Sequence, residues 1–140
     1  MSLKNSSIKW VAIGFITYVL LTFIAAGVLT SFWMAAQDLA GLSQQQVSLM
    51  AETDPFITMW SAVISLLAML LVSMLVTKKS ANRDFSTAIG LAMCLTLYGV
   101  LSIYLHPEHG FIQQVGKMVS PILVCLLGAL LAKRLFANPA

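Results

Sequence analysis

The stretch WVAIGFITYVLLTFIAAGVLTSFWMAAQ, residues 10–37, runs for 28 positions without a charged side chain. About 20 helical residues, at about 1.5 Å each, cross the roughly 30 Å hydrocarbon core of a bilayer. The stretch is therefore long enough to cross a membrane once. The whole chain agrees with this, because 59% of its 140 residues are apolar and only 9% are charged, whereas a soluble domain carries about 25% charged residues. Composition predicts an integral membrane protein.

Three further apolar segments follow. Residues 55–77 and 85–107 each contain 23 uncharged positions, which is enough for a span. The last segment is shorter, with 15 uncharged positions between Lys117 and Lys133. Its helix either starts at Ser120, with Pro121 in the first turn, or starts near Phe111. In the second case the Lys117 side chain extends to the headgroups and Pro121 kinks the helix. We favour the second alternative because it reaches the full thickness of the bilayer.

The predicted fold is an all-α integral membrane protein, in which four transmembrane helices form an antiparallel bundle. The expected spans are about 10–36, 56–77, 85–105 and 112–136, and residues 1–140 form a single membrane domain. No segment has the composition of a separate soluble domain.

A short helix is expected between the first two spans, at about residues 44–52. Ser43 and Gln46 have the spacing of a capping box, in which the hydroxyl accepts from the Gln46 amide and the Gln46 side chain reaches back. Asp54 and Pro55 then restart the chain as the cap and first-turn proline of the second span. One face of the short helix is apolar at helical spacing, which favours an interfacial position on the outer membrane surface; its residues are Val47, Met50 and Ala51.

The basic residues predict the orientation. With four spans, both termini lie on one side of the membrane, and that side holds seven of the eight Lys and Arg residues: Lys4, Lys9, Lys78, Lys79, Arg83, Lys133 and Arg134. Cytoplasmic loops carry the excess of Lys and Arg, so both termini are expected in the cytoplasm. A bacterial inner membrane is the expected location, with the first helix kept in the mature chain. No basic patch is interleaved with aromatic residues, so no nucleic-acid partner is expected.

The spans contain no Asp, Glu, Lys, Arg or His at mid-depth. Proton-coupled transporters keep an ionisable group inside the membrane, and a haem between helices needs buried axial ligands. The sequence also has no catalytic constellation or glycine-rich phosphate loop. We therefore expect no enzyme activity and no cofactor.

One loop has the composition of a metal site. His106, Glu108 and His109 supply two imidazoles and a carboxylate within four residues, which is a ligand set for zinc or copper. The alternative is an ordinary connection between two spans, since polar and turn-forming residues are what such a connection needs. Pro107 favours this alternative, because it disrupts the spacing that would direct both rings to one ion.

Small and hydroxyl residues recur on the spans and predict helix interfaces. On the second span Thr58, Ser61 and Ser65 lie at intervals of three and four. Three pairs of small residues are spaced by four positions, namely Gly27 with Ser31, Ala88 with Ala92, and Gly128 with Ala132. These positions are expected to form contacts within the chain, and the alternative is an interface with a second copy or a partner.

The function favoured by these observations is that of a small multi-pass membrane protein without catalytic machinery, acting as an accessory, assembly or regulatory subunit. One alternative is a homodimeric transporter or channel lined by Thr58, Ser61 and Ser65 together with Tyr98 and Ser102. The other is an outer-face metal-binding protein that uses His106, Glu108 and His109. The expected partners are the lipid bilayer and either another membrane protein or a second copy of the chain.

Overall fold

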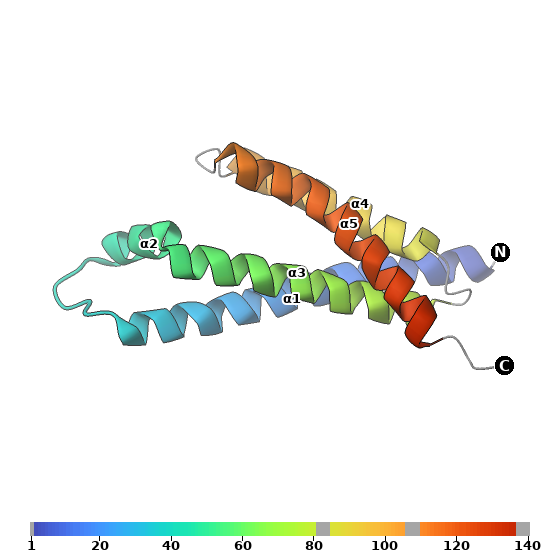
Figure 1. The fold of residues 1–140 in the computed structure, drawn as a ribbon, viewed down its shortest axis with the longest axis horizontal. Coiled ribbons are helices and arrows are strands. Elements are labelled where there is room, and N and C mark those ends of the chain that lie inside the picture. Colours follow the sequence, from blue (N-terminus) through green and yellow to red (C-terminus); the bar gives the residue numbers. More distant parts are fainter. Residues whose placement is uncertain (1, 81–84, 106–109, 137–140) are drawn as a thin grey trace. The chain divides into compact units, whose positions relative to one another are not determined.

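The computed structural model describes residues 2–80, 85–105 and 110–136. Over these ranges the chain is all-helical, with α1 (Ser2–Ala36), α2 (Gln44–Thr53), α3 (Pro55–Lys79), α4 (Phe85–Leu105) and α5 (Phe111–Leu135) (Figure 1). Four of these helices are long and apolar enough to cross a membrane. The predictions of four long apolar helices and of a short helix after the first are confirmed.

Two local predictions are also confirmed. Ser43 caps α2, with both hydrogen bonds of the capping box present. α5 begins at Phe111 and contains Pro121 in its interior, so the longer of the two alternatives for the last span is the correct one. The α5 ribbon bends part-way along its length (Figure 1), as expected for a helix that loses one backbone hydrogen bond at a proline.

The contacts divide the chain into two compact units. Unit 1 comprises residues 1–18 and 69–140, and unit 2 comprises residues 19–68. The predicted antiparallel bundle and single domain depend on how the units are arranged, and they stay predictions. Each unit is described by itself below.

The core of unit 1 receives side chains from all four long helices. A Cβ built on Gly14 of α1 would lie 2.6 Å from a methyl group of Val76 on α3 and 3.4 Å from one of Leu91 on α4. The buried residues of α4 and α5 are mostly small, and they include Ala88, Ala92, Cys125, Ala129 and Ala132. Small residues let helix backbones approach closely, which is how helices associate in lipid.

α5 makes two close backbone contacts in this core. A Cβ on Gly99 of α4 would lie 2.6 Å from the Lys117 carbonyl oxygen. A Cβ on Gly128 of α5 would lie 2.8 Å from the Leu70 carbonyl oxygen on α3. Both obstacles are backbone atoms, which cannot turn aside as a side chain can. Glycine is therefore required at both positions.

We expect Gly99→Ala to destabilise the protein by about 1–3 kcal/mol, the usual cost of overpacking a tight contact. Gly116→Ala is the matched control, because a Cβ there meets no atom within 4 Å and alanine is the better helix former. The measurement is the free energy of unfolding of the purified chain in mixed detergent micelles. Equal stabilities of the two variants would contradict the close contact at Gly99.

Unit 1 also buries several hydroxyl groups. Ser73 of α3 donates to the Cys125 carbonyl of α5 at 2.6 Å. The side-chain oxygens of Thr77, Thr87 and Thr96 are buried and have no hydrogen-bond partner among the described residues. A buried polar group without a partner costs free energy, whereas a satisfied one contributes to stability.

Thr87→Val and Ser73→Ala should therefore change stability in opposite directions. The first replaces an unpartnered hydroxyl by a methyl group of similar shape and should raise the free energy of unfolding by about 1 kcal/mol. The second removes a bond between α3 and α5 and should lower the free energy of unfolding by a similar amount. The same micellar unfolding measurement checks both, and destabilisation by Thr87→Val would show that its hydroxyl has a partner.

Candidate functional site

The candidate metal ligands cannot be located. His106, Glu108 and His109 lie outside the described residues, so their metal-binding role stays a prediction. Among the residues that the structure describes, no three His, Cys, Asp or Glu side chains gather closely enough to hold a metal ion.

The polar residues of the second span lie in unit 2. Ser61 and Ser65 line a small hollow between α1 and α3, opposite Thr22 and Ala26. Thr58 lies nearer the start of α3, where its hydroxyl donates to the Asp54 carbonyl at 3.0 Å. Two of the three predicted interface residues of the second span, Ser61 and Ser65, thus lie together between α1 and α3. The third, Thr58, forms a hydrogen bond in the first turn of α3.

The remaining predicted interface residue, Gly128, belongs to unit 1. It lies against Leu70 and Ser73 of α3, as described above. The transporter alternative places Tyr98 and Ser102 on the wall of a transport pathway. Both residues have contacts within this unit. The Tyr98 ring meets Phe15 edge-on with centroids 6.0 Å apart, and the Ser102 hydroxyl accepts from the Lys117 ammonium at 3.1 Å.

Lys117 extends along α4 toward the end of the helix. Its carbonyl lies against Gly99, while its ammonium reaches Ser102, three residues further toward the C-terminal end of α4. This is the direction that a lysine takes when it snorkels from a span to the headgroups. In a regular helix the residue at position 121 would donate its backbone N–H to this carbonyl. Pro121 has no N–H and cannot do so.

A hydrogen bond between two side chains connects the end of α1 with the start of α3. The Trp33 indole N–H donates to the Asp54 carboxylate at 3.0 Å, and Trp33 is only 4% exposed. The other carboxylate oxygen accepts from the backbone amides of Phe56 at 2.8 Å and Ile57 at 3.3 Å. Asp54 therefore caps α3 and holds α1 at the same time. The sequence indicated the cap but not the tryptophan, because a tryptophan at the end of a span is typical of a membrane anchor.

The hydrogen bond from Trp33 lowers the pKa of the Asp54 carboxyl, and the amides of Ile57 and Phe56 add to this effect against some desolvation. A carboxyl whose pKa is lowered by folding stabilises the folded state above its unfolded-state pKa. That contribution is lost as the pH falls through the lowered value.

Asp54→Asn should accordingly lower the thermal midpoint at pH 7, because the ionised acceptor of the indole N–H is lost. The difference from the wild type should shrink as the pH falls below about 4, because the wild-type carboxyl then becomes protonated and is as neutral as the asparagine. Thermal unfolding in mild detergent between pH 7 and pH 3 measures this. Trp33→Phe, which lacks the donor, should show a weaker pH dependence than the wild type. A difference that is constant down to pH 3 would mean that the charge of Asp54 is not the cause.

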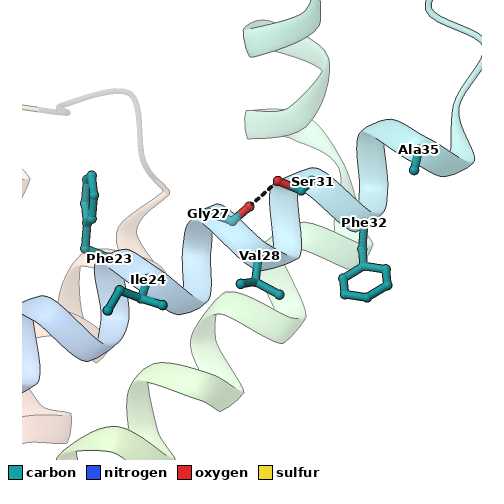
Figure 2. Close-up of a pocket in the computed structure, with 7 residues that line it drawn as sticks. All are labelled: Phe23, Ile24, Gly27, Val28, Ser31, Phe32 and Ala35. Atoms are coloured by element: carbon teal, nitrogen blue, oxygen red, sulfur yellow. Dashed lines mark hydrogen bonds between the residues drawn. The ribbon is translucent and has the colours of Figure 1, made fainter.

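One face of α1 in unit 2 is open. It is lined by Phe23, Ile24, Gly27, Val28, Ser31, Phe32 and Ala35, all from α1. Figure 2 shows Phe23 and Phe32 projecting in opposite directions from the helix, one before and one after the Gly27–Ser31 turn along the chain, and the two rings are 77% and 73% exposed. A Cβ on Gly27 would meet no atom within 4 Å. The Ser31 hydroxyl donates to the Gly27 carbonyl at 2.8 Å. We call this surface the α1 face.

The three predicted pairs of small residues therefore differ in their surroundings. Ala88 and Ala92 are buried in unit 1, and Gly128 and Ala132 are buried there as well. Gly27 and Ser31 are exposed. Two pairs lie inside the core of unit 1, and the third is open.

Comparison of this chain with protein-family models, curated proteins and solved structures gives no match.

Proposed function

We propose that this protein is a non-catalytic membrane subunit that binds another membrane protein by docking one of its transmembrane helices on the α1 face. The observation that carries the proposal is the open Gly27–Ser31 pair, which is exposed and has no atom within 4 Å of a Cβ built on Gly27. The other two pairs of small residues are buried within the chain, so the fold already uses this kind of contact.

The chemistry of the face favours an apolar helix over a soluble ligand. Lipid tails cover apolar side chains as well as a neighbouring helix does, so helices associate in membranes where small residues admit close packing. The Ser31 hydroxyl is already bonded to the Gly27 carbonyl. The face therefore offers an uncovered glycine beside exposed apolar side chains rather than free hydrogen-bonding groups.

α1 also has the surface to bind a partner. Only 11% of its most apolar 18-residue window is buried, against 28% in each of α3, α4 and α5. An accessory subunit needs one helix that its own fold leaves accessible, and α1 is the most accessible of the four long helices.

The proposed location is a bacterial inner membrane with both termini in the cytoplasm. The support for this orientation is the distribution of seven of the eight Lys and Arg residues on the side of the termini. In this orientation α2 lies on the outer membrane surface, with half-buried Val47 and Ala51 on its apolar face.

The decisive experiment is tagged purification at native expression level in mild detergent, comparing the wild type with Gly27→Leu. The wild type should bring along one membrane protein in fixed stoichiometry. Gly27→Leu should lose most of that companion at unchanged abundance and thermal midpoint, because a Cβ at this position meets no atom within 4 Å, whereas the leucine blocks a partner backbone. Gly116→Leu on α5 is the matched control, since that site is equally open, and it should retain the companion.

Three outcomes would contradict the proposal. Equal recovery of the companion with all three proteins would remove the α1 face as the docking surface. A lower thermal midpoint of Gly27→Leu, with the chain purified alone, would assign the face to a contact within the chain. Recovery of a homodimer that Gly27→Leu dissociates would make a second copy the partner and favour the homodimeric alternative.

A further inference from the structure

Basic side chains gather at one end of unit 1. The last turn of α3 carries Lys78 and Lys79, and the last turn of α5 carries Lys133 and Arg134. The described part of unit 1 contains no Asp or Glu, so no carboxylate within it neutralises these four charges. Asp84, which precedes α4 in the sequence, lies outside the described residues.

Two of the four cations are held by aromatic rings of neighbouring helices. The Lys78 ammonium lies 4.0 Å from the centroid of Phe136, the C-cap residue of α5. The Lys133 ammonium lies 3.9 Å from the centroid of Phe85, the first residue of α4. These contacts link α3 to α5 and α5 to α4, so the ends of three helices meet at this basic cluster.

A lysine ammonium group that lies over an aromatic ring can still donate hydrogen bonds to another group. A lysine ammonium has three N–H groups and no acceptor, and a ring attracts it from one side only. The remaining N–H groups of Lys78 and Lys133 are available to an oxygen anion. Because ring contacts fix both ammonium groups, binding such an anion requires little further ordering of the side chains.

The position of the cluster indicates which anion this is. α3 and α5 are apolar enough to cross a membrane, and the cluster ends both helices, which is where the headgroup region begins. The anion found at that depth is the phosphodiester of a phospholipid. Basic pockets between transmembrane helices are suited to anionic headgroups of this kind.

We propose that Lys78 and Lys133, at the meeting point of α3, α4 and α5, bind the phosphodiester headgroup of an anionic phospholipid. The site rests on the membrane insertion assumed in the proposed function, but it needs no protein partner. This site differs from the general attraction of basic residues to a charged membrane surface. To that attraction Lys79 and Arg134 contribute as much as Lys78 and Lys133 do.

Lys79 and Arg134 provide the matched comparison. They lie in the same two turns and carry the same total charge, but neither lies over an aromatic ring among the described residues. Replacing either pair removes two charges from the same helix ends. Only replacement of Lys78 and Lys133 removes the ammonium groups that the rings hold in place.

The experiment uses the purified full-length chain in nanodiscs of phosphatidylcholine with a minor share of phosphatidylglycerol. Mild detergent extraction followed by mass spectrometry of bound lipid gives the enrichment of phosphatidylglycerol over its bulk share. The wild type should show enrichment. Lys78→Met with Lys133→Met should remove most of this enrichment, because methionine keeps an apolar stem against the ring without the charge. Lys79→Met with Arg134→Met should reduce it much less.

A second double variant separates a binding defect from a folding defect. Lys78→Arg with Lys133→Arg keeps both charge and ring contact and should retain the enrichment, at a wild-type thermal midpoint. Loss of enrichment in this variant at an unchanged midpoint would overturn the proposal, as would equal losses from the two methionine pairs or the absence of enrichment in the wild type.

Two further measurements identify the ligand and test separately whether the protein inserts into a membrane. If excess inorganic phosphate displaced the bound lipid at constant ionic strength, the site would recognise the phosphate group alone, and its assignment to a membrane phospholipid would be wrong. Failure of the wild type to enter nanodiscs would overturn the proposal together with the membrane part of the proposed function. Absent enrichment after successful insertion overturns the lipid site alone.

Discussion

Two apolar helices gain little from meeting in hydrocarbon, because lipid tails cover their side chains as well as another helix does. Association then depends on how closely the backbones approach, and unit 1 depends on two such approaches by α5. Gly99 brings α4 against the Lys117 carbonyl, and Gly128 brings α5 against the Leu70 carbonyl. The hydrogen bond from Ser73 to the Cys125 carbonyl lies one helical turn from Gly128, so hydrogen bonding and close packing reinforce each other at the same place.

The contact at Gly99 and the proline in α5 involve the same backbone carbonyl. A proline inside a helix leaves the carbonyl four residues earlier without its usual donor, and here that carbonyl belongs to Lys117. The α4 backbone covers the same atom at Gly99. The Lys117 side chain meanwhile leaves the contact along α4 and reaches Ser102. A lysine, a proline and a glycine that are far apart in the sequence thus form one local arrangement.

Much of the secondary structure could be predicted from the sequence, because charges interrupt the apolar segments and caps mark helix starts. The start of α5 at Phe111 followed from the length that a span requires, and the α2 cap followed from the spacing of Ser43 and Gln46. The partners of single residues could not be predicted in this way. Gly99 belongs to no small-residue pair. Trp33 lies at the end of a span, where tryptophan is typical of a membrane anchor, so nothing in the sequence indicated that it donates to Asp54. Such contacts depend on which helices are neighbours, and local patterns do not carry that information.

The candidate site shows the same limit. Gly27 with Ser31 and Gly128 with Ala132 have the same spacing and comparable surroundings in the sequence, yet only the second pair is buried. Exposed phenylalanine rings alone would not single out the α1 face, since a ring exposed to lipid is in a favourable environment. What distinguishes the α1 face is its uncovered glycine. A glycine inside a helix lowers helix stability, and Gly99 and Gly128 each offset this cost by admitting a neighbouring backbone. At Gly27, as at Gly116, a Cβ would meet no atom of the described chain within 4 Å, and we propose that at Gly27 a helix of the partner protein offsets this cost.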